Sequence, residues 1–236
     1  MKAMILAAGR GERMRPLTDR HPKPLLKVDG RALIEWHIGA LKDAGIKDIL
    51  INTSWLGDQI PEYLGDGAYW GVNLTFSHEP KALETAGGIR KALDFFEDEP
   101  FIVVNGDVWT DFSYEELLKQ PINQPTKSAH IVLVPNPEHN SEGDFWLRED
   151  GLVVADGEQR LTFSGIGVYK PEIFKDIPED EPYPLAPKLR ELMVEAEVTG
   201  ELFEGRWHDI GTPERLETLN QSFQRRIKTI EYDGKL

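Results

Sequence analysis

Continuous apolar runs alternate, along the first half of the chain, with longer segments in which apolar residues recur every three or four positions. The continuous runs are typical of buried strands, and the longer segments are typical of helices with one apolar face. We expect strands at residues 3–6, 49–53, 74–77 and 101–105, and helices at residues 31–44, 57–64 and 85–96. Strands that alternate with helices of this length predict βαβ units and a mainly parallel sheet.

The pattern changes after Lys127. Shorter apolar segments, separated by polar turns, predict strands at residues 129–134, 144–147, 152–155 and 162–169. A helix at 185–196, a strand at 207–210 and a helix at 213–224 are expected to follow, with Thr212 and Pro213 suited to the start of the last helix. Because no repeat and no low-complexity linker divides the chain, we expect a single compact unit.

The segment after the first expected strand is rich in glycine and basic residues. It reads Leu6-Ala-Ala-Gly9-Arg-Gly11-Glu-Arg13-Met-Arg-Pro-Leu-Thr18, and Pro22-Lys23-Pro24 follows it. A glycine-rich turn at the end of a buried strand lets backbone N–H groups approach phosphate oxygens, because no Cβ blocks the way. The spacing fits neither a Walker A loop nor the three-glycine Rossmann fingerprint. The segment therefore predicts a phosphate-binding loop of another kind.

Composition narrows the range of partners. The chain has 236 residues and no cysteine, and its 27 Lys and Arg against 41 Asp and Glu give a formal charge of −14. Such a balance disfavours general nucleic-acid binding, which needs a basic surface. An acidic chain that holds phosphates suggests a divalent cation. The apolar run at residues 3–8 is too short for a signal peptide and no stretch has membrane-spanning length, so we expect no membrane partner and a cytoplasmic location.

Two carboxylates stand where a metal ion could be held. Asn105-Gly-Asp107 closes the fourth expected strand, and Trp207-His-Asp209-Ile-Gly-Thr212 precedes the last helix. Magnesium prefers oxygen ligands and often takes one or two carboxylates together with substrate phosphates. The alternative interpretation is structural, since Asn-Gly-Asp favours a turn by itself and Asp209 could cap the next helix.

These motifs together resemble the sugar-1-phosphate nucleotidyltransferase family. The resemblance implies an α/β fold, Rossmann-like and GT-A-like, with a mixed, mainly parallel sheet flanked by helices. It also implies one nucleotidyltransferase domain over residues 1–236, with a nucleotide-binding half at 1–126, a sugar-phosphate-binding half at 127–224 and a tail at 225–236. The implied reaction is nucleotidyl transfer, in which a sugar 1-phosphate attacks the α-phosphorus of a nucleoside triphosphate and pyrophosphate leaves.

The resemblance also assigns roles to residues. It implies that Asp107 and Asp209 hold Mg²⁺, that Arg13 stabilises the leaving pyrophosphate, and that Lys23 bridges the α-phosphate and the incoming phosphate. The nucleotide-binding residues that it implies are Ala8, Gly9, Gly11, Glu12, Arg13, Lys23, Glu79, Thr85 and Gly88. The sugar-side residues are Asn105, Gly143, Asp144 and Glu158. The chain departs from the family at Glu84, where glycine is common, and it lacks the family's frequent Glu-Lys-Pro motif.

The short length and the segments Asn105-Gly-Asp-Val-Trp-Thr-Asp111 and Gly143-Asp-Phe resemble one subgroup of the family in particular. This subgroup implies UTP and N-acetylmuramic acid α-1-phosphate as substrates, in the recycling of peptidoglycan sugars for the cell wall. Alternatives within the family are mannose 1-phosphate with GTP, or glucose 1-phosphate with dTTP or UTP. An alternative of another class is an inactive module that senses nucleotides, which the retained Arg13, Lys23, Asp107 and Asp209 disfavour.

Overall fold

The computed structural model describes residues 1–120, 122 and 126–233, with side chains described as far as residue 225. The strands of this part are β1 (Lys2–Leu6), β2 (Lys27–Val28), β3 (Arg31–Ala32), β4 (Asp48–Thr53), β5 (Asn73–His78), β6 (Phe101–Asn105), β7 (Val108–Thr110), β8 (Ala129–Val134), β9 (Phe145–Leu147), β10 (Val153–Val154), β11 (Arg160–Tyr169), β12 (Val198–Leu202) and β13 (Trp207–Asp209). Its α-helices are α1 (Leu33–Asp43), α2 (Gln59–Leu64), α3 (Glu84–Lys91), α4 (Leu93–Phe96), α5 (Leu185–Val194) and α6 (Pro213–Asp233).

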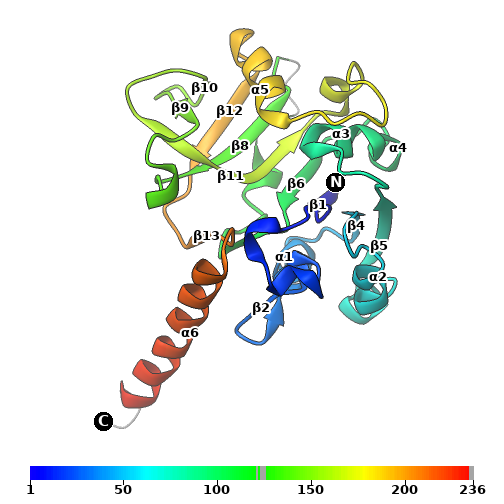
Figure 1. The fold of residues 1–236 in the computed structure, drawn as a ribbon. Coiled ribbons are helices and arrows are strands. Elements are labelled where there is room, and N and C mark those ends of the chain that lie inside the picture. Colours follow the sequence, from blue (N-terminus) through cyan, green and yellow to red (C-terminus); the bar gives the residue numbers. More distant parts are fainter. Residues whose placement is uncertain (121, 123–125, 234–236) are drawn as a thin grey trace.

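One mixed sheet organises the molecule (Figure 1). In its first half the strands β5, β4, β1 and β6 lie side by side and are all parallel. In its second half β11 runs antiparallel to β6, β8 and β9, and β12 runs parallel to β8. Helices cover both faces, which confirms the expected α/β class with a mixed sheet and flanking helices.

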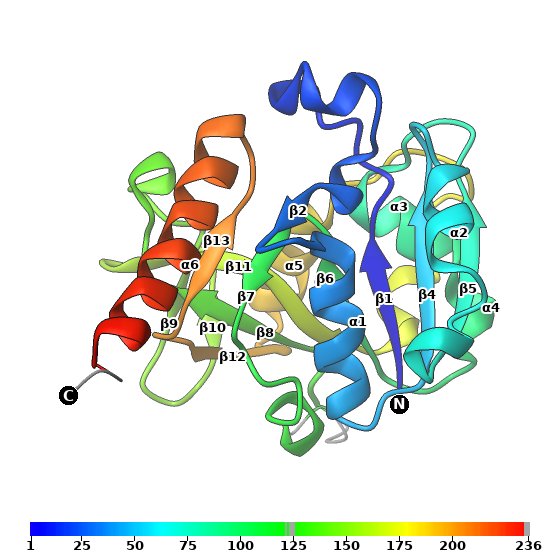
Figure 2. The ribbon, with the colours of Figure 1, turned by 90° about the horizontal axis from the view of Figure 1, so that it is seen from below.

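The alternation of side chains along β1 divides the core into two layers. Ala3 and Ile5 face α1 and α2, whereas Met4 faces α3, α4 and α5 on the other side (Figure 2). All three side chains are fully buried, and each large apolar side chain buried in this way contributes about 1.5–3 kcal/mol to folding. Helices on both faces explain why the inner parallel strands β1, β4 and β6 each carry a continuous apolar run, whereas the edge strand β5 does not.

A third, smaller core joins distant parts of the chain. Met14 of the loop after β1 and Trp109 of β7 pack in one cluster with Ile210 and with Leu216 and Leu219 of α6. The short antiparallel pair β7–β13 lies beside this cluster, with Asp209 opposite Val108 in the register. The cluster therefore holds the ends of both predicted metal motifs next to the predicted phosphate-binding loop.

The structure differs from the sequence-based expectation at several boundaries. The helix expected at 85–96 is two helices, α3 and α4, that adjoin at Ala92. Strand β12 was not expected, because Val198-Thr-Gly-Glu-Leu contains a glycine and two polar residues. Helix α6 continues to Asp233, so the expected tail begins inside a helix, and its last residues, 234–236, lie outside the described residues. Among the described helices, none is long and apolar enough to cross a membrane.

Candidate active site

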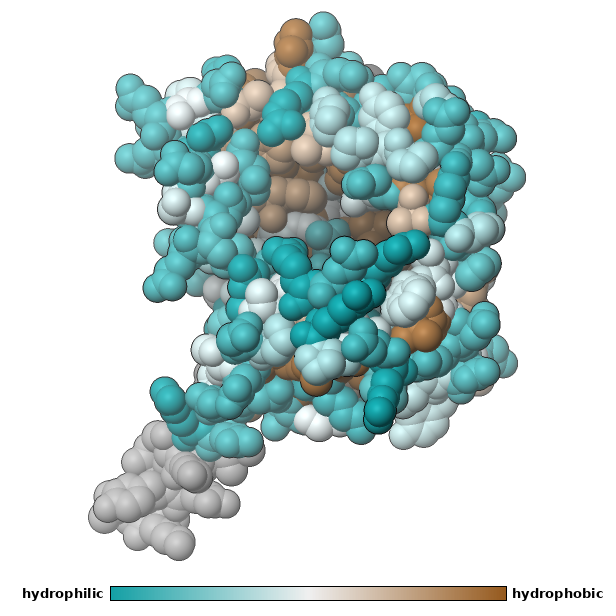
Figure 3. All heavy atoms as spheres, viewed as in Figure 1, coloured by the Kyte–Doolittle hydropathy of each residue, from teal (hydrophilic) through white to brown (hydrophobic). Residues whose placement is uncertain are grey.

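A cavity of about 320 Å³ lies beyond the carboxyl ends of β1, β4 and β6. Figure 3 shows the surface hollowed at this place, with hydrophilic side chains along its rim. Its lining comes from residues 6–9 after β1, from Lys23 and Pro24, from Asn52 and Glu79 at strand ends, from the start of α3, and from Asn105 and Asp107. Open α/β sheets bind their ligands at this edge, where several strand ends converge.

A second cavity, of about 370 Å³, adjoins the first and shares Asn105 and Asp107 with it. The rest of its lining is mostly polar and comes mainly from the second half of the chain. It comprises Arg13, Val108, His139, Asn140, Asp144, Thr162, Phe163, Ser164, Trp207 and Asp209. Two adjoining cavities that share one carboxylate can bring two ligands into contact at that carboxylate.

The two glycines of the loop after β1 serve different purposes. Gly9 lines the first cavity, and a Cβ placed on it would meet nothing within 4 Å, so the space beside it is open to a ligand. Gly11 has a φ of +61°, and a Cβ there would lie 2.8 Å from Cγ2 of Thr18. The Thr18 hydroxyl also donates to the Gly11 carbonyl at 2.7 Å. Gly11 therefore makes the turn possible, whereas Gly9 leaves room for a phosphate.

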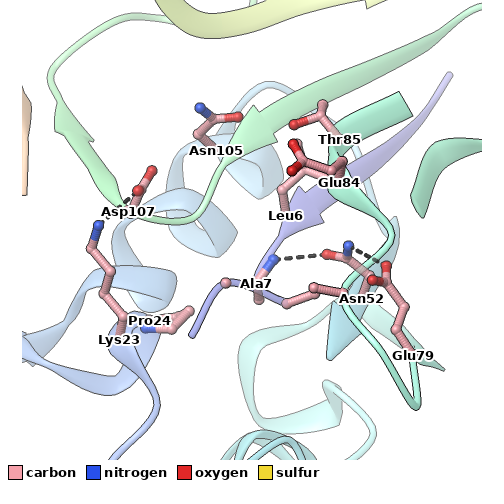
Figure 4. A pocket seen from close by; sticks show the side chains of 13 residues that line it. Leu6, Ala7, Lys23, Pro24, Asn52, Glu79, Glu84, Thr85, Asn105 and Asp107 are labelled. Carbon is pink, nitrogen blue, oxygen red and sulfur yellow. Dashed lines mark hydrogen bonds and ion pairs between the residues drawn. The ribbon is translucent and has the colours of Figure 1, made fainter. Parts of the chain in front are cut away.

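Lys23 and Asp107 form an ion pair inside the cleft. The Lys23 Nζ lies 2.7 Å from Oδ2 of Asp107, with 9% of the lysine side chain and 38% of the aspartate side chain exposed (Figure 4). The lysine sits in a short 3₁₀ turn, Lys23–Leu25, that the preceding Pro22 leads into. The lysine is nearly buried and the carboxylate is partly exposed. The carboxylate of Asp107 therefore faces the two cavities, and the ammonium group of Lys23 is held beside it.

Asp209 reaches the same cleft from β13. Its Oδ2 lies 2.6 Å from Nη1 of Arg215 and 3.3 Å from Nε2 of His139. The N–H of Ile210 donates to the Asp107 carbonyl at 2.9 Å, which ties the turn that holds Asp107, directly before β7, to the end of β13 that holds Asp209. Both carboxylates already neighbour a cationic side chain, which marks the place as one that favours positive charge.

The donor set suits magnesium. Two carboxylates line one cavity next to the predicted phosphate-binding loop, and Mg²⁺ commonly binds one or two carboxylates plus phosphate and water oxygens. Within the described residues no group of three or more His, Cys, Asp or Glu is arranged to hold a metal ion. The chain therefore fits an ion that completes its coordination with substrate oxygens better than one enclosed by protein.

Asp144 anchors the polar side of the second cavity. Its Oδ2 accepts hydrogen bonds from the Phe163 N–H at 2.8 Å and from Nδ2 of Asn140 at 3.1 Å. The Asn140 amide also donates to the hydroxyl of Thr162, which donates in turn to Oδ1 of Asn136. These bonds hold an acceptor-rich surface rigidly, which is suited to a ligand with hydroxyl or amide hydrogens.

A buried histidine supports the junction of the two cavities. Nε2 of His37, on α1, lies 2.7 Å from the Val108 carbonyl, and Nδ1 lies 2.9 Å from the Tyr114 hydroxyl. Burial lowers the pKa of His37 to about 4, so the imidazole is neutral at pH 7. It then donates from Nε2 to the carbonyl and accepts from the hydroxyl, which fixes β7 directly after Asp107.

Comparison with known proteins agrees with this geometry. Residues 2–226 match the Nucleotidyl transferase family. The chain belongs to this family. An N-acetylmuramate alpha-1-phosphate uridylyltransferase from Neisseria meningitidis is 52% identical over 220 residues, which is 92% of this chain and 95% of that protein. One of the same description from Caulobacter vibrioides is 33% identical over 224 residues, covering 90% of this chain and 92% of that protein.

A solved structure shows the same fold at lower identity. A putative glucose-1-phosphate thymidylyltransferase from Bacillus anthracis superimposes with a TM-score of 0.82 at 23% identity, over 94% of each chain. The expected family fold, a mixed, mainly parallel sheet flanked by helices, is therefore confirmed.

Ten of the residues selected from the sequence line the cleft. They are Ala8, Gly9, Lys23, Glu79, Thr85, Asn105 and Asp107 in the first cavity, and Arg13, Asp144 and Asp209 in the second, with Asn105 and Asp107 common to both. The structure thus brings together the predicted nucleotide, sugar and metal residues. Their individual roles stay predictions.

Five selected residues lie outside the described lining of both cavities: Gly11, Glu12, Gly88, Gly143 and Glu158. A Cβ on Gly88 would lie 2.7 Å from Oε1 of Glu79, and one on Gly143 would lie 2.7 Å from the Arg160 backbone. Both glycines thus leave room for protein atoms. Glu158 is exposed in the turn between β10 and β11.

Sequence reasoning missed several lining residues, among them Asn52, Asn140 and Trp207. A signal existed for Asn52, because a polar residue follows the apolar run Ile49-Leu-Ile51 at the carboxyl end of an expected strand. A signal also existed for Trp207, because it stands two positions before Asp209 in the expected strand at 207–210 and side chains two apart in a strand share a face. Asn140 carried no such signal, since it reaches the cleft through tertiary packing.

Glu84 is the residue that stands where the family commonly has glycine. It has a φ of +59°, in the left-handed region that glycine adopts readily and other residues adopt at a cost. Figure 4 shows its carboxylate pointing into the first cavity beside Thr85. Glu84 therefore places a charged group at a position whose backbone conformation glycine adopts more readily.

Proposed function

We propose that this chain transfers the uridylyl group of UTP to the phosphate of N-acetylmuramic acid α-1-phosphate in the cytoplasm, giving the UDP-sugar and pyrophosphate. One observation carries the proposal: two adjoining cavities share Asn105 and Asp107, so two phosphate-bearing ligands would meet there. The first cavity has the loop and strand ends suited to a nucleotide, and the second has the acceptors suited to a sugar. The 52% identical relative supports the choice of substrates.

The nucleophile requires no strong base. The phosphate of a sugar 1-phosphate has a second pKa near ~6, so it is mostly dianionic at neutral pH. One of its oxygens bonds to the α-phosphorus of UTP, the bond from that phosphorus to the bridging oxygen breaks, and the electron pair leaves with pyrophosphate. Catalysis then depends on alignment and on charge stabilisation.

The side chains of the cleft would divide this work. Lys23 would release Asp107 and bridge the α-phosphate and the incoming phosphate. Arg13, which lines the second cavity and not the first, would stabilise charge on the departing pyrophosphate where that group reaches the junction of the two cavities. Asp107 and Asp209 would hold Mg²⁺, which supplies positive charge to the phosphates when bound. The carboxylate of Asp144 would accept hydrogen bonds from the sugar, and the amide of Asn105 would donate hydrogen bonds to the sugar and accept them from it.

Pyrophosphate release tests the proposal directly. The purified protein is given UTP and Mg²⁺ with N-acetylmuramic acid 1-phosphate, or with mannose, glucose or N-acetylglucosamine 1-phosphate. We expect the fastest release with the muramic sugar, and slower release when GTP or dTTP replaces UTP. Faster release with mannose 1-phosphate and GTP, or with glucose 1-phosphate, would keep the reaction and replace the substrates. Nucleotide binding without release for any pair would identify an inactive sensing module.

A further inference from the structure

Two buried polar side chains connect the loops on either side of the first cavity. Asn52 at the end of β4 is 2% exposed, and Glu79, directly after β5, is 1% exposed. We propose that Asn52 and Glu79 form a positioning pair, which holds the loop after β1 and the loop before α3 at the separation that a bound nucleotide requires. The inference rests on the proposed function for the identity of that nucleotide, UTP.

The pair forms an unbroken series of three hydrogen bonds. The N–H of Ala7 donates to Oδ1 of Asn52 at 2.7 Å, and Nδ2 of Asn52 donates to Oε1 of Glu79 at 2.7 Å. The N–H of Leu83 donates to Oε2 of Glu79 at 3.0 Å. Figure 4 shows the first two of these bonds across the floor of the cavity. The amide of Asn52 and the carboxylate of Glu79 together connect the segment that leads to Gly9 with the segment that leads to Glu84 and Thr85.

The direction of the bonds dictates the chemistry of Glu79. Backbone N–H groups can only donate, and they stand at both ends of the series. The Asn52 amide accepts on one side and donates on the other, so the group at position 79 must accept twice. An ionised carboxylate accepts strongly at both oxygens, whereas an amide would set its NH₂ group against one of the two donors and a protonated acid would accept more weakly at its hydroxyl oxygen. Glu79 is therefore required as an anion.

Joining two loops through a buried anion costs free energy, because the charged group loses its hydration. Burial raises the pKa of Glu79, opposed by its bonds to Asn52 and to the Leu83 N–H and by the nearby charges of Lys91 and His78. Apolar packing would fill the same space without that cost. A carboxylate here therefore contributes more to exact placement than to stability.

Helix α3 is built to accommodate the pair. A Cβ on Gly88 would lie 2.7 Å from Oε1 of Glu79 and 3.0 Å from Nδ2 of Asn52. The glycine thus admits the two polar groups beneath the helix, which is independent support for their joint role. Gly88, selected from the sequence as a nucleotide contact, acts on this view through Glu79.

Exchange of the two chemical groups tests the inference. The variants are Asn52→Asp, Glu79→Gln and the double variant, all nearly equal in size to the originals. Asn52→Asp would set carboxylate against carboxylate, and Glu79→Gln would leave one N–H donor without an acceptor. In the double variant the carboxylate introduced at position 52 accepts from the Ala7 N–H and from the amide introduced at position 79. The oxygen of that amide accepts from the Leu83 N–H, so all three bonds are restored.

We expect each single variant to raise the KM for UTP about tenfold to a hundredfold, the loss expected for a buried hydrogen bond to a charged group. The kcat should change less than about threefold, and the double variant should return to within about threefold of the wild-type KM. The control is Asn73→Asp, alone and with Asp48→Asn. This exposed Asn–Asp pair joins β4 and β5 at their opposite ends, with Nδ2 of Asn73 2.8 Å from Oδ1 of Asp48. Both control variants should leave the KM for UTP unchanged.

The positioning pair would be overturned if the fold-increase in KM of the double variant equalled the product of the fold-increases of the two single variants. A loss confined to kcat would overturn it as well. Thermal unfolding of the wild type, the two single variants and the double variant checks that each protein is folded. The positioning pair is also overturned if the single variants are unfolded and the double variant is folded but does not bind UTP. UTP affinity is also measured by calorimetry without sugar. If the wild-type protein binds UTP but does not transfer its uridylyl group, the proposed function is wrong. The positioning pair is then still tested by whether the double variant recovers the UTP affinity that the single variants lose. A wild-type protein that does not bind UTP defeats both.

Discussion

The two cavities that meet at Asp107 are built in different ways. The first lies at the ends of parallel strands, and backbone loops and a buried hydrogen-bond series shape it. The second is lined by side chains from the antiparallel half and from β13, joined to one another by side-chain hydrogen bonds. Under the proposed function, the nucleoside triphosphate occupies the first cavity, where backbone loops provide much of the lining. The sugar 1-phosphate occupies the second, where side chains provide most of it.

This difference predicts that substitutions in the two cavities have separable kinetic effects. The largest effect is expected at the junction itself. Replacement of Lys23 by Ala should lower kcat about 10²- to 10³-fold, because a preorganised positive group is lost from the reacting phosphates. Thermal stability should change much less, since the partner carboxylate of Asp107 is 38% exposed. Pyrophosphate release measures the effect, and Lys27→Ala, on the exposed side of β2, is the control.

The junction should also respond to acid. The pKa of His37 is lowered from 6.5 to about 4 in the folded protein. Between these values the unfolded chain takes up a proton that the folded chain refuses, so the free energy of unfolding falls as the pH falls. The stability is fully present above pH 6.5, and about 3 kcal/mol of it should be lost by pH 4. Urea unfolding at several pH values measures this loss.

Two variants sharpen that measurement. His37→Gln should remove most of the pH dependence attributable to this site. Tyr114→Phe removes the hydroxyl but leaves the imidazole buried against the Val108 carbonyl, so it should keep the dependence. An unchanged pH profile in His37→Gln would show that other groups carry the acid sensitivity.

A smaller and more selective effect is expected from Asp144 in the second cavity. Asp144→Asn replaces a charged acceptor by a neutral group, so the KM for the sugar 1-phosphate should rise about tenfold, as for loss of a charged hydrogen bond. The KM for UTP should stay within about twofold. The exposed neighbour Glu142 supplies a control, Glu142→Gln. Equal increases in both KM values would contradict the separation of the two cavities.

The smallest effect concerns the backbone of the first cavity. In Glu84→Gly, relief of the left-handed conformation gains about 1–2 kcal/mol, and the freedom of glycine in the unfolded chain costs about 0.5–1 kcal/mol. The net stability should therefore rise by about 0.5 kcal/mol while the KM for UTP changes severalfold. Glu97 also has a φ of +59°, away from the described lining of both cavities, so Glu97→Gly should alter stability alone. An unchanged KM in Glu84→Gly would show that its carboxylate does not face the nucleotide.

Sequence reasoning worked best where local pattern decides structure. The apolar runs identified β1, β4 and β6, and strand ends placed Gly9, Asn105 and Asp107 correctly at one edge of the sheet. It could not tell a glycine that leaves space for a ligand from a glycine that leaves space for another part of the protein. Gly88 leaves space for Glu79 rather than directly for a ligand, and only tertiary packing reveals the difference.

The same limit applies to partners that are distant in sequence. The bond between Lys23 and Asp107 spans 84 positions, and that between Asn52 and Glu79 spans 27. Neither motif contains its partner, so charge and polarity were visible in the sequence but their pairing was not. β12 was missed for a related reason, since its pairing with β8 compensates for a composition that disfavours a strand.

The small core around Met14 has a consequence for how the protein comes into being. The loop after β1 is synthesised before its packing partners Ile210, Leu216 and Leu219, which come much later along the chain. While the chain grows on the ribosome, Met14 has no such partners, and the loop after β1 lacks its support. The emergence of α6 therefore completes the N-terminal motif, and a truncated translation product would carry the motif without the means to hold it in shape.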